Sequence, residues 1–365
     1  MTIHSIELFA GAGGLALGLE KAGFEAVLLN EIDKYACATL RQNRPNWNVI
    51  EGDISQIDFS PYHQKIDFVS GGFPCQAFSY AGHGRGFDDV RGTLFFEFAR
   101  AIEQIQPKVF LGENVRGLLN HDGGRTLATI KQVISDLGYT IIESQVLKAM
   151  FYRVPQKRER LFIVAVRNDL AEKAQFNPPK PHHRAMTMCD ALKAGELYDC
   201  DVPKSDGAIY SPKKKAVLDL VPAGGYWRDL PDDVQREYMK KSYFLGGGKT
   251  GMARRLSWNE PSLTLTCAPA QNQTERCHPD ETRPLAVREY ARIQTFPDDW
   301  QFMGAIAAQY KQIGNAVPVN LAYAVGKSLI ELISSLDKQS LSVEQNTKSW
   351  QYAYLSNSVQ REIFT

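Results

Sequence analysis

The segment Ile3–Gly14, which reads IHSIELFAGAGG, opens the chain with an apolar strand pattern that runs into a cluster of glycines. A helical pattern follows these glycines and continues to about Lys21. A strand, a glycine-rich turn and a helix in this order are typical of the first unit of an open α/β sheet. Glycines at Gly11, Gly13 and Gly14 let the backbone approach a ligand closely. We therefore expect a ligand-binding α/β fold.

The first half of the chain continues to alternate strand-like and helix-like segments. Alternation of this kind predicts a doubly wound, mostly parallel sheet with helices on both faces. The expected strands are Ile3–Phe9, Ala26–Asn30, Asn48–Ile50, Asp67–Gly71, Val109–Leu111, Thr140–Leu147 and Leu161–Val166, and the expected helices include Tyr35–Gln42, Thr93–Ile105 and Arg125–Leu137.

The pattern breaks near Asn168, which indicates a second, smaller domain. Prolines, a Lys213-Lys214-Lys215 run and a triple glycine at 246–248 interrupt the region, and its strand-like pieces, such as Ser262–Thr266, are short. A helical pattern returns near Arg288 and again at Ala322–Leu332. We predict four parts: a large domain at 1–170, an irregular domain at 171–285, a return segment at 286–335 that completes the large domain, and a tail at 336–365.

Bulk composition excludes few functions. The 365 residues carry a formal net charge of only +1, which gives no sign of a nucleic-acid partner but leaves room for a local basic groove. The six cysteines form no Cys-x-x-Cys pair, so we expect no metal site, and a reducing, cytoplasmic setting is the simplest interpretation. No apolar run appears long enough to span a bilayer, so we expect no membrane partner.

An acidic residue follows the glycine turn at the spacing of a ribose ligand. Glu31 ends the second expected strand, about twenty residues after the glycines, where a carboxylate can bind ribose hydroxyls. This fits a cofactor that contains adenosine without saying which one. Because Gly11-x-Gly13-x-x-Ala16 also matches the dinucleotide fingerprint, NAD remains an alternative on this motif alone.

A cysteine lies just past another expected strand, in the run GGFPCQ at 71–76. Ligands of open α/β sheets bind at the carboxyl ends of the strands, so Cys75 is expected at the working edge. A lone cysteine is usually a small buried hydrophobe. Here the neighbouring proline, glutamine and glycines favour an exposed thiol. Cys75 is therefore a candidate nucleophile, which would act as a thiolate.

Three further motifs point toward the same edge. Glu113 follows a strand in the tripeptide ENV, where a carboxyl group can face the same crevice as Cys75. Arg158 and Arg160 alternate in the run PQKRER, and two neighbouring guanidinium groups suit a phosphate or a carbonyl oxygen. Gly314 and Asn315, in the run IGNAVP, indicate a tight turn into a helix. Each motif alone also has a purely structural interpretation: Glu113 as a surface acid, the two arginines as a solvated strand edge, and Gly314-Asn315 as a turn.

Taken together and in this order, the motifs resemble the DNA (cytosine-5) methyltransferase family of bacterial restriction-modification type. The matching blocks are FAGxGG, PCQ, ENV, QxRxR and GNxVP, and further blocks occur at Asn30-Glu31, at GDI (52–54), at GTLFF (92–96) and from Arg288 to Pro297. The likeness covers about Ile6 to Gly326, with a gap where the family has its variable target-recognition region. The joint pattern is much more specific than any single block.

The resemblance implies a role for each matching position. Cys75 would attack C6 of a flipped-out cytosine in double-stranded DNA, Glu113 would contact N3 and the amino group, and Arg160 with Arg158 would hold the base. S-adenosylmethionine would be held by Phe9, Ala10, Gly11, Gly13, Gly14, Glu31, Ile32, Asp53, Ile54, Pro74, Leu94, Asn315 and Val317. We expect DNA contacts from Gln76, Ser79, His83 and Arg85 in a mobile loop, and from Lys249, Arg254, Arg255, Thr264, Gln271, Gln273 and Arg276 in the target-recognition domain at 171–285.

Alternatives remain from other classes of protein. An NAD-dependent oxidoreductase explains the glycine turn and Glu31 but leaves Cys75 and Glu113 without a role. A catalytically silent DNA-binding relative does not explain why both Cys75 and Glu113 are present. A tRNA cytosine-5 methyltransferase would use the same chemistry. We expect a monomer that acts on DNA, with a restriction endonuclease as a functional partner but without a stable complex.

Overall fold

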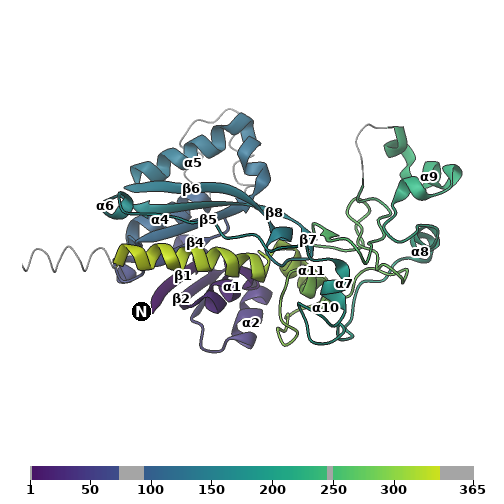
Figure 1. Cartoon of the computed structure of the whole chain (residues 1–365), viewed down its shortest axis with the longest axis horizontal. Coiled ribbons are helices and arrows are strands. Elements are labelled where there is room, and N and C mark those ends of the chain that lie inside the picture. Colours follow the sequence, from purple (N-terminus) through teal and green to yellow (C-terminus); the bar gives the residue numbers. More distant parts are fainter. Residues whose placement is uncertain (1, 74–93, 245–249, 338–365) are drawn as a thin grey trace, which may run out of the picture.

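The computed structural model describes residues 2–73, 94–244 and 250–337, and its largest element is a seven-stranded sheet (Figure 1). The strand order is β3-β2-β1-β4-β5-β8-β6. Strands β1 to β5 pair in parallel, whereas β8 runs antiparallel to both β5 and β6. The expected mostly parallel sheet is confirmed. The strands are β1 (Ile3–Leu8), β2 (Phe24–Glu31), β3 (Val49–Glu51), β4 (Phe68–Gly71), β5 (Val109–Val115), β6 (Tyr139–Lys148) and β8 (Glu159–Arg167).

Helices cover both faces of the sheet, because both faces are apolar. On one face, Leu15 and Leu19 of α1 (Gly14–Ala22) and Leu329 of a helix over 319–337 pack with strand residues such as Phe162. On the other face, Phe98 of α4 (Leu94–Ile105) and Ile130 of α5 (Arg125–Asp136) lie in one core cluster with strand residues such as Phe110. Helix α2 (Lys34–Asn43) follows β2. Figure 1 shows the long C-terminal helix crossing the sheet.

Two glycines of the first turn are required by packing. Gly13 has a φ of 84°, and a Cβ there would lie 2.7 Å from Leu40 and 3.2 Å from Trp300. A Cβ on Gly14 would lie 2.3 Å from the backbone oxygen of Val317. The segment around Val317 therefore sits directly on the start of α1, which joins the far end of the chain to the first turn.

The C-terminal helical region over Ile306–Asp337 is long and apolar enough to cross a membrane by length and composition alone, but 67% of its apolar stretch is buried inside the protein. It consists of α11 (Ile306–Asn315) and the helix over 319–337, separated by a break at 316–318. Val325, Leu329 and Leu332 lie in the apolar core against the sheet. This region is a core element of the large lobe.

A smaller lobe has its own core and little regular structure. Tyr210, Leu218, Trp227, Ala253 and Cys277 pack together within it. Figure 1 shows α8 and α9 of this lobe well away from the sheet. Its helices are α7 (Met188–Leu192), α8 (Pro212–Asp219) and α9 (Asp232–Met239), and a two-stranded sheet of β7 (Gln156–Lys157) and β9 (Ser262–Leu263) joins it to the large lobe; α6 (Asn168–Ala171) precedes it and α10 (Val287–Ile293) follows it.

The boundary between the lobes is less sharp than a single residue number indicates. Met188 and Leu192, within the expected smaller domain, pack in the same core cluster as Leu40 and Trp300 of the large lobe. The strand expected at Ser262–Thr266 is confined to Ser262–Leu263. The separate core of the smaller lobe begins only near Tyr210.

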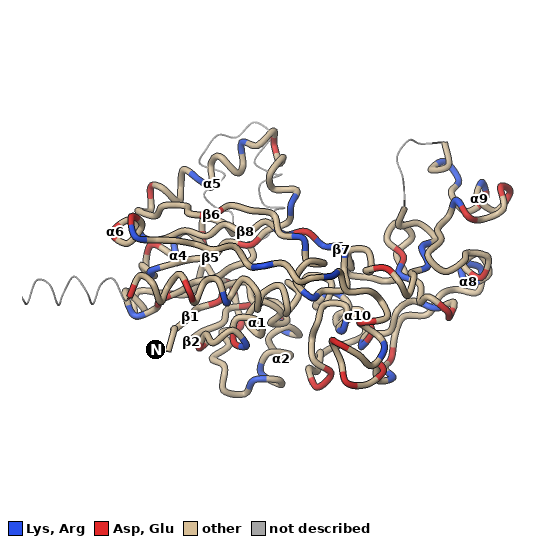
Figure 2. Tube along the Cα trace, in the orientation of Figure 1, with Lys and Arg blue, Asp and Glu red and all other residues tan. Residues whose placement is uncertain are grey.

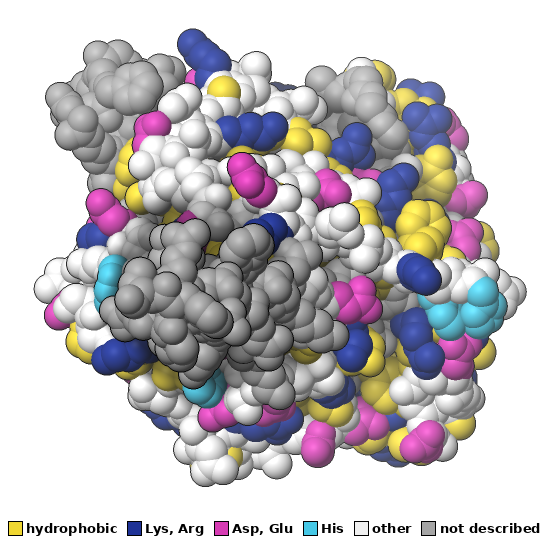
Figure 3. Space-filling view, turned by 60° about the vertical axis from the view of Figure 1, so that its left-hand side comes forward, with side chains coloured by type: hydrophobic (Ala, Val, Ile, Leu, Met, Phe, Trp, Pro, Cys, Tyr) yellow, Lys and Arg dark blue, Asp and Glu magenta, His cyan; other side chains and the backbone are white. Residues whose placement is uncertain are grey.

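Charges of both signs are spread over the molecule. Figure 2 shows Lys and Arg interspersed with Asp and Glu along both lobes, in keeping with the net charge of +1. On the face shown in Figure 3, basic side chains stand among acidic and apolar ones rather than in one continuous patch. Any affinity for a polyanion must therefore come from a local arrangement of basic groups.

Candidate active site

Glu31 closes the carboxyl end of β2 against the glycine turn. Its Oε2 accepts a hydrogen bond of 2.7 Å from the backbone N–H of Gly11, and its Oε1 accepts from the N–H groups of Ile32 and Asp33, each at 2.8 Å. A carboxylate has about four acceptor positions, so one remains for a hydroxyl donor. A Cβ on Gly11 would meet nothing within 4 Å, so the turn is open at this point.

The surroundings of Glu31 fit an adenosine group. The side chain of Ile32 is 69% exposed, which leaves an apolar surface free to cover a planar ring. Asp53 lies next to Gly52, whose N–H binds the carbonyl of Glu31, and the Asp53 carboxylate is exposed. Phe9 adopts a φ of 58°, an unusual conformation for a residue other than glycine that often marks a ligand site. A carboxylate, an open turn and an apolar surface are therefore together at one sheet edge.

The other expected cofactor residues occupy different positions. The Ala10 and Ile54 side chains are buried, so only their backbones could face a ligand, and Leu94 is half-buried at the start of α4. Asn315 is exposed, and its Oδ1 accepts a hydrogen bond of 3.2 Å from the Cys267 thiol. Val317 is buried against Gly14. Pro74 lies outside the described residues.

A buried ion pair lies at the centre of the edge. Glu113 on β5 and Arg160 on β8 approach to 2.8 Å between Oε1 and Nε, and each side chain is only 11% exposed. The two strands pair directly, with Val115 opposite Arg160. Burial raises the pKa of Glu113, whereas the charges of Arg160 and Arg158 oppose that rise. A raised pKa means that this carboxyl group holds its proton to higher pH than an exposed glutamate does, as a proton donor requires.

The segment after β4 that leads to Cys75 lies against this ion pair. A Cβ on Gly72 would lie 2.9 Å from Oε2 of Glu113, and the side-chain amide of Asn114 donates a hydrogen bond of 2.7 Å to the carbonyl of Phe73. Cys75 follows Phe73 by two residues in the sequence. Cys75 itself, with the expected DNA contacts Gln76, Ser79, His83, Arg85 and Lys249, lies outside the described residues.

A cavity of about 430 Å³ opens beside the ion pair. Arg160, Val115 and Met150 line it from the large lobe, and Thr264 lines it from the smaller lobe. Its rim carries three basic groups, Arg116, Lys148 and Lys157, together with one acid, Glu159, which pairs with Arg116 at 2.8 Å. Basic groups around a cavity of this kind suit a phosphate backbone.

Arg158 is buried and bonded to the protein backbone. The side chain is only 1% exposed, and its two terminal nitrogens donate to the backbone oxygens of Leu265, at 3.1 Å, and Gly314, at 2.9 Å. Both nitrogens are therefore directed at the protein backbone. These two bonds hold segments of the protein together, while the Arg158 side chain also lines the cavity beside Arg160, so a role beside the base stays a prediction.

The basic residues expected to contact DNA in the smaller lobe divide into two groups. Arg255 is 5% exposed and donates to the carbonyls of Leu218, Val221 and His278. Arg276 is also buried, and it donates to the carbonyl of Thr264. We therefore correct the expectation for Arg255 and Arg276, because neither presents its guanidinium group to the outside.

The remaining DNA candidates are accessible. Gln271 and Gln273 are exposed, and Arg254 is half-buried. Thr264 is half-buried and donates a hydrogen bond of 2.7 Å to the carbonyl of Lys157. These four residues stay predicted DNA contacts.

Glu7 is a buried carboxyl group that the sequence interpretation missed. It lies on β1 opposite Ser70 of β4, and its Oε2 has no hydrogen-bond partner among the described residues. Burial raises its pKa to about 8, and nearby Glu113 and Glu31 act in the same direction. The only signal in the sequence was one acid inside an apolar strand.

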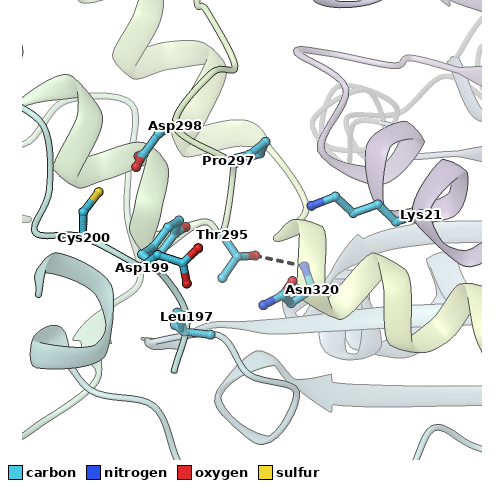
Figure 4. A pocket seen from close by; sticks show the side chains of 9 residues that line it. Lys21, Leu197, Asp199, Cys200, Thr295, Pro297, Asp298 and Asn320 are labelled. Atoms are coloured by element: carbon cyan, nitrogen blue, oxygen red, sulfur yellow. Dashed lines mark hydrogen bonds between the residues drawn. The ribbon is translucent and has the colours of Figure 1, made fainter. Parts of the chain in front are cut away.

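Two further features lie away from this edge. His182, His183 and Glu196 could approach a metal ion, but the Glu196 carboxylate already pairs with Arg184 at 2.7 Å and Arg153 at 3.6 Å, and these positive charges oppose a cation. A cavity of about 290 Å³ lies between Lys21 and the loop that carries Asp199 and Cys200 (Figure 4). In it, the Thr295 hydroxyl accepts a hydrogen bond from the backbone N–H of Asn320.

Comparison with known proteins agrees with this geometry. The family model described as C-5 cytosine-specific DNA methylase matches residues 3–331. The type II methyltransferase M.Eco47II of Escherichia coli is 69% identical over 92% of this chain and 80% of its own length. The type II methyltransferase M.PspPI of Psychrobacter sp. (strain TA137) is 65% identical over 91% of this chain and 80% of its own length.

Solved structures support the fold. A putative DNA modification methyltransferase encoded within an Escherichia coli prophage superposes with a TM-score of 0.70 at 24% identity, over 91% of this chain and 100% of that one. Spodoptera frugiperda DNMT2 gives a TM-score of 0.58 at 16% identity, over 91% and 99%. The fold is that of the S-adenosylmethionine-dependent methyltransferases.

The chain belongs to the C-5 cytosine-specific DNA methylase family. It is a DNA (cytosine-5) methyltransferase that uses S-adenosylmethionine as its methyl donor. The alternative of an NAD-dependent oxidoreductase is therefore set aside, and so are a silent relative and a tRNA enzyme.

Proposed function

We propose that the Cys75 sulfur, the Glu113 carboxyl group and the Arg160 guanidinium group carry out the methylation of a cytosine that has left the DNA helix. The observation that supports this most is the buried Glu113–Arg160 pair, which lies beside a cavity and against the segment that leads to Cys75. Because target atoms are stacked inside a duplex, the base has to be extruded before it can enter such a cavity, at a cost of roughly a few kcal/mol.

Methylation requires a nucleophile from the enzyme, because C5 of cytosine is itself a poor nucleophile. The Cys75 thiolate forms a bond to C6, and the electron pair of the C5–C6 double bond becomes available at C5. When bound, S-adenosylmethionine supplies an electrophilic methyl group on a sulfonium sulfur. C5 would take that methyl group, with the electrons of the methyl–sulfur bond staying on the sulfur. A water molecule would then accept the C5 proton, the electron pair of that C–H bond would re-form the C5–C6 double bond, and the Cys75 sulfur would leave as a thiolate.

Glu113 would stabilise the negative charge that develops on the cytosine ring. A proton shared with N3 stabilises the negative charge produced by addition of the thiolate. The raised pKa of Glu113 favours a carboxyl group that still holds its proton. Arg160 fixes the orientation of this carboxyl group through the 2.8 Å ion pair. Together they would place the proton where the base arrives.

Glu31, Gly11 and Ile32 would hold the adenosine part of the cofactor, with Asp53 and Asn315 at its sides. Double-stranded DNA would cross the basic rim formed by Arg116, Lys148 and Lys157, with the smaller lobe reading its sequence through exposed residues such as Gln271 and Gln273.

We propose the domain limits given above, with 171–285 as the target-recognition domain. We also propose that the enzyme acts as a monomer in the cytoplasm, paired in function with a restriction endonuclease.

A mechanism-based trap tests the nucleophile. DNA in which 5-fluorocytosine replaces cytosine should form a stable covalent adduct with the wild-type enzyme and S-adenosylmethionine, because fluorine cannot leave as a proton does. Peptide mapping should locate the adduct at Cys75. The Cys75→Ser variant should form no adduct yet bind S-adenosylmethionine with unchanged affinity. An adduct at another residue, or full methyl transfer by the variant, would remove Cys75 from the mechanism.

A further inference from the structure

The junction of the two lobes contains three polar side chains that are almost completely buried. Gln156, Arg158 and Gln294 are between 0% and 1% exposed. Buried polar groups are costly unless they are bonded, so their partners show what they hold. In this structure the partners belong to two segments, one in the smaller lobe around Leu265 and one over 313–316 at the end of α11.

The first connection runs through Arg158. One terminal nitrogen donates to the carbonyl of Leu265 at 3.1 Å, and the other donates to the carbonyl of Gly314 at 2.9 Å. A guanidinium group is planar and has donors in fixed directions, so it can join two backbone carbonyls as a rigid link. An ammonium group on a flexible chain cannot reproduce this geometry.

The second connection runs through the two glutamines. The side-chain oxygen of Gln156 accepts from the backbone N–H of Leu265 at 2.9 Å, and its amide donates to the side-chain oxygen of Gln294 at 2.9 Å. Gln294 then donates to the carbonyls of Ile313, at 2.7 Å, and Ala316, at 3.1 Å. Both backbone polar groups of Leu265 are therefore linked to the same short segment.

Each end of these connections adjoins one of the two proposed ligand sites. Thr264, next to Leu265, lines the cavity beside Arg160, and its carbonyl accepts a hydrogen bond from Arg276. At the other end, Asn315 and Val317 follow Gly314, and Val317 lies on the glycine turn at Gly14. Buried hydrogen bonds thus form a continuous path between the two sides.

We propose that Arg158, together with Gln156 and Gln294, couples S-adenosylmethionine binding to DNA binding, so that each ligand tightens the other. Arg158 is a positioning residue in this scheme, because its bonds go to protein backbone. The proposal rests on the assignment of the two ligand sites made under the proposed function. Coupling between two ligands is reciprocal and is typically about 5- to 150-fold in affinity.

The test is a double binding measurement. The DNA probe is a duplex that carries the cytosine site identified by bisulfite sequencing of plasmid from expressing cells. The second ligand is S-adenosylhomocysteine, the product left when the methyl group has gone. The dissociation constant of the duplex is measured with and without S-adenosylhomocysteine, and the ratio is the coupling. For the wild-type enzyme we expect a ratio of at least about 5.

Arg158→Lys should bring this ratio close to 1, and Gln156→Met should lower it by removing the other connection. Arg255→Lys is the matched control, because Arg255 is also a buried arginine whose backbone partners all lie within the smaller lobe. It should lower the melting temperature but keep the wild-type ratio. A merely structural role for Arg158 would weaken both affinities and leave the ratio unchanged.

Three results would overturn the proposal: a wild-type ratio of 1, an unchanged ratio in Arg158→Lys, or an equal loss of coupling in Arg255→Lys. If Arg158→Lys does not fold, Gln156→Met decides by the same criterion. Methyl transfer to plasmid DNA by the wild-type enzyme is measured in parallel. Transfer without coupling refutes only this inference, whereas absence of transfer refutes the proposed function itself.

Discussion

The charged side chains at the strand ends of the large lobe differ in use from those inside the smaller lobe. In the large lobe, Glu113 and Arg160 pair with each other beside a cavity, and Glu31 accepts three backbone N–H bonds but keeps one acceptor position, so these groups are available for chemistry. In the smaller lobe, regular structure is sparse, and Arg255 and Arg276 are buried to satisfy backbone carbonyls. An arginine in an irregular lobe can thus be structural even where the protein binds DNA.

The same principle appears in the loop that carries the exposed glutamines. Lys214 donates to the carbonyl of Ala270 at 2.6 Å and to Asn272 at 2.8 Å, and it pairs with the buried Glu275. Tyr238 donates to the same carboxylate. Buried charges therefore hold the backbone from which Gln271 and Gln273 extend.

The largest expected effect is a loss of catalysis in the large lobe when Glu113 is replaced. Glu113→Gln keeps the shape of the side chain but cannot pass a proton, so we expect kcat to fall by about 10²- to 10⁴-fold. In the wild type, kcat/KM should fall as pH rises through the raised pKa of Glu113, because the protonated fraction decreases. Steady-state rates across pH would show this limb, and the variant should lack it.

The control for Glu113→Gln is the affinity for S-adenosylhomocysteine, which should stay within about twofold. Glu113 pairs with Arg160 and not with the residues around Glu31. A variant with near-wild-type kcat would mean that the buried ion pair is structural. The contrast between the lobes would then disappear.

An intermediate effect sharpens the contrast inside the smaller lobe. Arg255→Ala leaves several buried carbonyls without a donor, so we expect a loss of about 2–4 kcal/mol in the free energy of unfolding. Gln273→Ala, at an exposed position of the same lobe, should change that free energy by less than about 0.5 kcal/mol. Denaturant titration measures both.

For discrimination between DNA sequences, we expect the reverse: Gln273→Ala should have the larger effect and Arg255→Ala the smaller one. Gln273→Ala should alter discrimination between target and non-target duplexes by about 1–3 kcal/mol, as expected for the loss of a base contact. Arg255→Ala, measured under conditions where it is folded, should keep the discrimination. Loss of discrimination in Arg255→Ala without loss of stability would restore Arg255 as a DNA contact.

The smallest effect concerns Glu7 in the sheet. Its pKa is about 8 in the folded protein and near 4.5 when exposed, so the folded state holds the proton more tightly. The stability that this proton contributes is present below about pH 4.5 and is lost as pH rises through 8. Between about pH 5 and pH 8.5, the melting temperature of Glu7→Gln should therefore rise relative to wild type by a few degrees. Parallel profiles would show that Glu7 does not titrate in this range.

The sequence alone determined the fold class and the order of the motifs. An apolar strand followed by FAGAGG is a local pattern, and the period of the side chains repeats along the sheet, so the strands at Ile3–Leu8 and Phe68–Gly71 were expected within one residue or two of their ends. Glu31 and Glu113 were expected at the carboxyl ends of strands for the same reason. Their residue types also matched a family, which the comparisons confirm.

Only the tertiary structure decided which arginines are available. Arg158 and Arg160 are two residues apart, yet one bonds the backbone of distant segments and the other pairs with Glu113. Arg255 looks like a DNA contact in the sequence, but its partners lie 23 to 37 residues away. Burial and bonding partners come from segments that folding brings together, and local patterns carry no information about them.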